Sequence, residues 1–92
     1  MPFIRTVPVA RAEGELGRLY EQVGKARGGV ADIHQVQSLN PPALAAHLEL
    51  YKAIMFRPSP LSRAWREAIA VAVSRANQCA YCEAHHGAAL AA

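Results

Sequence analysis

Apolar side chains recur along the chain at the spacing of amphipathic helices rather than strands. The clearest run follows the i, i+3, i+4, i+7 pattern and ends at Gly28-Gly29. No stretch reads as a strand, and no internal repeat is visible. The pattern therefore predicts an all-α protein and argues against a thioredoxin fold, in which strands alternate with helices. The residues of the first run are Leu16, Leu19, Tyr20 and Val23.

Two more helices are expected before the middle of the chain. Ile33 and Val36 predict a short helix that ends before Asn40. Pro41-Pro42 then open a third helix, since proline is favoured in a first helical turn. Its apolar positions form a single stripe and predict one buried face. These positions are Leu44, Leu48, Tyr51 and Met55.

A fourth helix follows the stiff loop 57–60, with Ser62 as its expected N-cap. Residues 68–73 of this helix are apolar on all sides, so we expect the helix to be buried. Glu67 lies at the edge of this apolar stretch, where an unpaired carboxylate is costly. A simpler reading of Glu67 is an ion pair with Arg63 or Arg66 on a solvated edge.

The candidate chemistry lies near the C-terminus. Cys79 and Cys82 are the only two cysteines, and His86 follows four residues after the second. On a helix that begins near Cys79, both sulfurs and the imidazole share one face. The positive end of a helix favours a thiolate in its first turn, which points to Cys79 as the nucleophile. The spacing predicts a dithiol that cycles through a disulfide while the histidine moves protons.

Glu67 reaches these cysteines only if the chain bends. On one continuous helix it would lie about 18 Å from Cys79 along the axis. Asn77-Gln78 is the expected break, because asparagine is a good helix terminator. A corner between two packed helices would return Glu67 to the thiols.

The stretch from Leu61 to Leu90 resembles the AhpD-like alkylhydroperoxidase branch of the carboxymuconolactone decarboxylase superfamily, and within it the peroxidase-related proteins. Segments 37–44 and 56–62 are similar to the same proteins, so the resemblance covers most of the chain. It implies an all-α, AhpD-like helical bundle that is oligomeric and needs no cofactor. The residues that carry the resemblance are Glu67, Cys79, Tyr81, Cys82, His85 and His86.

The resemblance also implies roles for individual residues. Cys82 would be the peroxidatic cysteine, Cys79 the resolving one, and Glu67 with His86 the proton relay. The best-studied members carry a histidine where this chain has Tyr81, so we expect a shorter relay or one that uses His85 or water. The implied partners are a hydroperoxide substrate and an external dithiol or disulfide reductase. A homo-oligomer (dimer, trimer or hexamer) is also implied.

Composition narrows the possibilities. The net charge of +3 is spread along the chain without a basic cluster, which argues against nucleic-acid binding. No apolar run approaches the roughly 20 residues that span a bilayer, and no signal sequence follows Met1. We expect a cytoplasmic protein with one domain over 1–92. Related proteins continue for several helices beyond the motif, so we expect either a C-terminal truncation or helices supplied by neighbouring subunits.

Other readings of the cysteine segment stay open. The two cysteines could form a simple buried pair, or could bind zinc together with His85 or His86. The competing class of function is a non-catalytic helical oligomerisation module whose Cys/His cluster binds metal or senses oxidation. The leading prediction is a thiol-dependent peroxidase that uses no metal. A lactone decarboxylase is disfavoured, because that reaction has no use for paired thiols.

Overall fold

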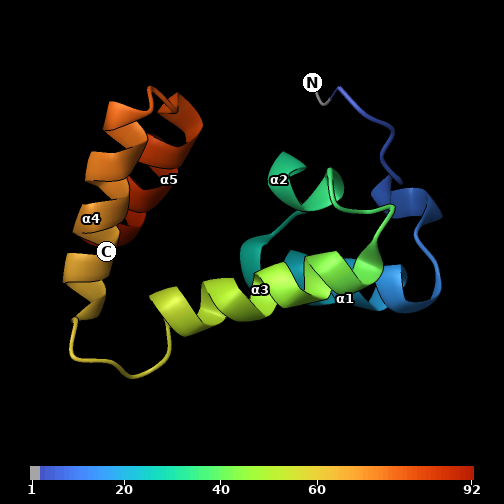
Figure 1. Ribbon diagram of the computed structural model, residues 1–92, viewed down its shortest axis with the longest axis horizontal. Helices are drawn as coiled ribbons and strands as arrows, with labels where there is room; N and C mark the ends of the chain where they lie inside the picture. Colours follow the sequence, from blue (N-terminus) through green and yellow to red (C-terminus); the bar gives the residue numbers. More distant parts are fainter. Residues whose placement is uncertain (1–2) are drawn as a thin grey trace. The chain divides into compact units, whose positions relative to one another are not determined.

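The computed structural model describes residues 3–92, and within that range all regular structure is helical (Figure 1). The prediction of an all-α protein is therefore confirmed. The chain divides into two compact units, Met1–Glu49 and Leu50–Ala92. The elements in order are a short 3₁₀ helix η1 (Val9–Arg11) and the helices α1 (Gly14–Arg27), α2 (Asp32–Gln35), α3 (Pro41–Met55), α4 (Arg63–Ala76) and α5 (Ala80–Ala91).

Two predicted helix ends are confirmed. Helix α1 ends at Gly28, whose φ of 78° is left-handed and costs glycine no steric strain. Helix α4 begins after Ser62, whose hydroxyl accepts a hydrogen bond of 3.2 Å from the Trp65 N–H. This bond satisfies one of the amide groups that the first turn leaves without an intrahelical partner.

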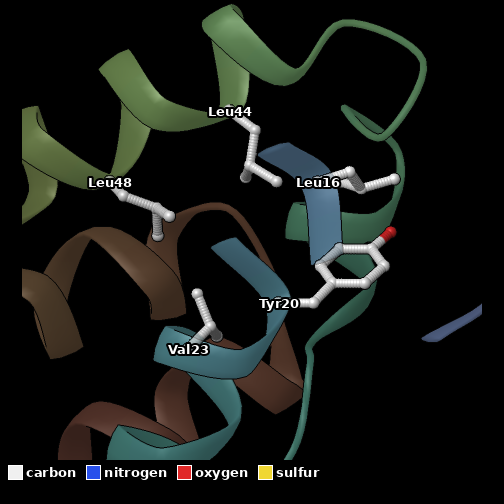
Figure 2. Close-up of a cluster of buried hydrophobic side chains, with 5 residues drawn as sticks. All are labelled: Leu16, Tyr20, Val23, Leu44 and Leu48. Carbon is white, nitrogen blue, oxygen red and sulfur yellow. The ribbon is translucent and has the colours of Figure 1, made fainter. Parts of the chain in front are cut away.

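The first unit is held by the apolar faces of α1 and α3, as Figure 2 shows. The predicted stripes supply its buried side chains, and Leu44 is fully buried. The phenol of Tyr20 donates a 2.9 Å hydrogen bond to the Val7 carbonyl, so the ring packs without leaving its hydroxyl unsatisfied. The buried cluster consists of Leu16, Tyr20, Val23, Leu44 and Leu48.

The short helix α2 forms where it was expected, but with a different side chain inside. Ile33 is 56% exposed, whereas His34 is buried. The His34 ring meets the His47 ring edge-on, with 5.7 Å between centroids. The apolar positions thus located this helix correctly but did not predict its buried face.

The second unit is built on α4 and α5, which pack side by side as a helical hairpin (Figure 1). The expected break at Asn77-Gln78 is confirmed, because α4 ends at Ala76 and Cys79 caps α5. The left-handed residue is Gln78, with φ of 55°, and not the asparagine before it. The Gln78 N–H bonds to the Arg75 carbonyl at 3.0 Å, which closes the end of α4.

The expectation that α4 is buried is wrong for its apolar residues. Ile69 and Val73 are each about half exposed, and Trp65 is 65% exposed. The buried residues of α4 are instead Glu67 and Ser74. The physical reason is that α5 covers only one side of α4. Because α4 has apolar residues on all sides, those on its other sides stay exposed. None of the described helices is long and apolar enough to cross a membrane.

Candidate active site

The two cysteines lie at the start of α5 and are joined as a disulfide. Cys79 is the N-cap residue, and Cys82 lies in the first helical turn. Their Cα atoms are 5.3 Å apart, within the usual range for a disulfide. The Cys82 N–H also donates to the Cys79 sulfur at 3.3 Å. One helical turn therefore holds both sulfurs within bonding reach without any distant rearrangement.

Glu67 lies next to His86 across the hairpin. The His86 Nδ1 and Glu67 Oε2 atoms are 3.0 Å apart, although nineteen residues separate them in sequence. The other oxygen, Oε1, accepts from the Arg63 guanidinium at 3.4 Å. Glu67 is only 1% exposed. The carboxylate therefore does pair with Arg63, but it is buried and not on a solvated edge.

This contact determines how the imidazole can act. An ionised carboxylate can only accept hydrogen bonds, so Nδ1 of His86 carries the hydrogen and donates it. The neutral ring then has Nε2 available to accept a proton. The geometry makes His86 suited to act as a base. Glu67 orients its ring and stabilises the imidazolium that forms when the ring accepts a proton.

A pocket of about 500 Å³ lies in the second unit and contains the cysteines and His86 in its wall. Most of the remaining wall is aliphatic. Glu67 does not line the pocket but lies behind His86, which it contacts. The structure thus brings the predicted site residues together as a lining group with a supporting acid. The lining residues are Ile54, Met55, Leu61, Arg66, Ile69, Ala70, Val73, Ser74, Asn77, Cys79, Cys82 and His86.

Tyr81 and His85 lie outside this pocket lining. Tyr81 is 63% exposed, and its ring stacks on that of His85 with 6.0 Å between centroids and 13° between planes. His85 in turn meets His86 edge-on at 5.5 Å. Tyr81 therefore does not line the pocket, and the His85 ring lies against that of His86.

Sequence reasoning missed Arg66 as a pocket residue, because it was considered only as an ion-pair partner of Glu67. Its guanidinium instead donates to the Leu61 carbonyl and the Ser59 hydroxyl. The signal was present in the helical register, since Arg66, Val73 and Asn77 are spaced to share one face of α4.

A zinc site made of Cys79, Cys82 and His85 or His86 is the alternative prediction for this segment. Within residues 3–92, no group of three or more His, Cys, Asp or Glu side chains is arranged to hold a metal ion. The two sulfurs are bonded to each other in this structure.

Known proteins resemble the chain in both sequence and structure. The profile of the carboxymuconolactone decarboxylase family matches residues 41–92, which is more than half of the chain. The chain belongs to this family. Among solved structures, the chain is similar to one described as the core of alkylhydroperoxidase AhpD from Rhodospirillum rubrum ATCC 11170. The present chain matches it with a TM-score of 0.76 and 30% identity, over 98% of this chain and 69% of that one.

A comparison with curated proteins gave no match. The family and the AhpD-like fold expected from the cysteine segment are confirmed by the two matches that were found.

Proposed function

We propose that this protein is a thiol-dependent peroxidase that reduces organic hydroperoxides through a Cys79–Cys82 disulfide cycle. One observation carries the proposal: the disulfide lines the same pocket as His86, whose Nδ1 is held 3.0 Å from the buried Glu67 carboxylate. A redox-active pair, a base and an orienting acid are the groups that peroxide reduction by a thiol requires.

In the reduced protein, Nε2 of His86 accepts the proton of the Cys82 thiol. The thiolate attacks the terminal oxygen of the hydroperoxide, the O–O bond breaks, and the alcohol leaves with the proton that His86 returns. Cys82 is now a sulfenic acid. The Cys79 sulfur attacks it, the S–O bond breaks, water is released and the disulfide forms. An external dithiol then restores both thiols by two exchange steps and becomes a disulfide itself.

Cys82 is proposed as the attacking sulfur because His86 lies one helical turn after it. The helix N-terminus stabilises negative charge on either sulfur, and the N–H that Cys82 donates to the Cys79 sulfur adds to this at Cys79. A stabilised Cys79 thiolate is the form that resolves a sulfenic acid on Cys82. The two sulfurs thus have different surroundings that match different roles.

We further propose that copies of this chain assemble with one another. Large apolar side chains are exposed over the second unit, and contiguous exposed apolar surface is typical of interaction sites. Trp65 is the largest of these side chains on α4. The family name also includes a decarboxylase, but a lactone decarboxylation gives no role to a disulfide-forming pair, so that activity is not proposed here.

The proposed function is tested by following cumene hydroperoxide consumption with dithiothreitol as reductant. Wild type is compared with Cys82→Ser and Cys79→Ser. Turnover should be lost in Cys82→Ser, and a dimedone adduct at Cys82 should be trapped in Cys79→Ser. A wild-type protein without turnover, or a Cys82→Ser variant as active as wild type, would contradict the dithiol cycle. Stoichiometric metal in the reduced protein would favour the non-catalytic module.

A further inference from the structure

The pocket beside the disulfide is lined along α4, with a polar residue near each end of that helix. Arg66 lies near the start of α4, whereas Asn77 follows the end of that helix, next to the cysteines. Their separation of eleven positions corresponds to about 16 Å along the axis. The wall between the two ends is aliphatic, with Ile69 and Val73 from α4 and Ile54 from α3. A ligand that fills this pocket has a long apolar middle.

Arg66 differs from two other arginines of the second unit, Arg63 and Arg75, in its partners. Its Nε and one Nη donate to the Leu61 carbonyl at 3.0 and 2.8 Å, and the same Nη donates to the Ser59 hydroxyl at 2.9 Å. Arg63 and Arg75, in contrast, form ion pairs with glutamates. Within the described part of the chain, Arg66 therefore donates only to neutral acceptors, and no carboxylate neutralises its charge.

An arginine whose orientation is already fixed, and whose charge no carboxylate neutralises, is preorganised to bind an anion. The guanidinium has five N–H donors, and the contacts to the loop before α4 leave donors available while they restrict its orientation. The N–H groups that remain are those of the other Nη, and they can donate charge-assisted hydrogen bonds to a carboxylate. Less orientational freedom is lost on binding when the side chain is already held.

We propose that the pocket binds fatty-acid hydroperoxides, with the substrate carboxylate on Arg66, the acyl chain along the aliphatic wall and the peroxide group at Cys82. This inference rests on the proposed function and names its substrate class. The volume of about 500 Å³ is within the usual range for pockets that bind small molecules. A small neutral peroxide would use neither Arg66 nor most of this wall.

Arg66 could have a purely structural role, in which it only joins the 59–61 loop to α4. Substrate selectivity distinguishes this role from binding of the substrate carboxylate. We would compare kcat/KM for a linoleic acid hydroperoxide and for its methyl ester in wild type, Arg66→Gln and Arg66→Lys. Wild type should prefer the acid by about tenfold or more, which corresponds to one charge-assisted contact. The preference should disappear in Arg66→Gln and return in part in Arg66→Lys. Arg75→Gln, which removes an exposed arginine outside the pocket, should keep the wild-type preference.

Equal losses on acid and ester in Arg66→Gln would overturn the proposal, as would a wild type with no preference. In either case, turnover of cumene hydroperoxide would leave the peroxidase function standing.

Binding of laurate and of methyl laurate to the oxidised protein, measured by calorimetry, tests the site without turnover. Laurate should bind wild type at least tenfold tighter than it binds Arg66→Gln. Laurate that binds both equally, or binds neither, would overturn the proposal. Tight binding that depends on Arg66, in a protein without peroxidase activity, would support the carboxylate-binding site at Arg66. It would contradict the proposed peroxidase function instead.

Discussion

His86 and Glu67 are nineteen residues apart in sequence and 3.0 Å apart in space, Nδ1 to Oε2, across the α4–α5 hairpin. The contact leaves only Nε2 of the imidazole to exchange protons. It also places the negative charge of the carboxylate beside the ring, where it stabilises an imidazolium. Glu67 can therefore act on the cysteines through His86, without lining the pocket itself. In the proposed mechanism, Glu67 is a positioning residue and His86 is the group that moves the proton.

Glu67→Gln should keep the shape of this contact and remove its charge. An uncharged amide stabilises the imidazolium less, so we expect kcat/KM for cumene hydroperoxide to fall by about 10²-fold, a typical contribution of proton transfer. Initial rates with excess dithiothreitol measure this, after circular dichroism has shown that the variant is folded. Glu21→Gln is the control, since it removes an acid from an exposed helical ion pair with Lys25. Activity of Glu67→Gln within twofold of wild type would show that the Glu67 charge does not contribute to the mechanism.

Arg63→Gln should lower stability more than Arg75→Gln. Arg63 donates to the buried Glu67 carboxylate at 3.4 Å and lies 4.1 Å from the centre of the Phe56 ring. Loss of both contacts should cost about 1–2 kcal/mol, reduced because the Arg63 side chain is 49% exposed. The Arg75–Glu83 pair has both members substantially exposed, so its loss should cost about 0–1 kcal/mol. Urea unfolding compares the two variants. Equal midpoints would mean that the Arg63–Glu67 pair adds nothing to the free energy of unfolding beyond what the Arg75–Glu83 pair adds.

Gln78→Gly should stabilise the hairpin. Gln78 has a φ of 55°, a conformation that strains any residue with a Cβ atom and does not strain glycine. We expect an increase of about 1 kcal/mol in the free energy of unfolding, measured by urea denaturation. Asn77→Gly is the matched control, because Asn77 has a φ of −85° and glycine there only adds freedom to the unfolded chain. A gain in stability at position 77, or a loss at 78, would contradict the assigned turn.

Trp65→Ser should weaken self-association. Trp65 is 65% exposed on α4, and a large aromatic side chain at an interface commonly contributes more than 1 kcal/mol to binding. Light scattering after size exclusion should give a wild-type mass of a dimer or larger and a lower mass, or faster dissociation on dilution, for the variant. Ile33→Ser, at an exposed position on α2 in the other unit, serves as the comparison. A monomeric wild type would contradict the proposed assembly.

The helices and the cysteine constellation could be predicted from the sequence because they depend on local geometry. The spacing of Leu16 to Val23 and of Leu44 to Leu48 predicted faces that are buried in the first unit. Gly28 and Ser62 end and begin their helices through contacts within a few residues. Cys79 and Cys82 share a face because any helix places residues three apart on the same side.

The positions that sequence reasoning misjudged depend on neighbours far along the chain. Residues 68–73 were expected to be buried, but a helix is buried only where another element covers it, and α5 covers one side. Arg66 was considered as a partner of Glu67, yet the side-chain direction at the start of α4 takes it to the loop that precedes the helix. Neither outcome is encoded in apolar spacing.

The sequence by itself therefore determined the helices, their caps and a thiol pair in register with His86, since backbone geometry fixes distances within one helix. The tertiary structure alone decided that Glu67 is buried against His86 and that Arg66 and the disulfide lie in one pocket. The reason is the turn at Gln78. A single left-handed residue sets the direction of α5 relative to α4, and a change there would separate side chains that their sequence positions do not bring together.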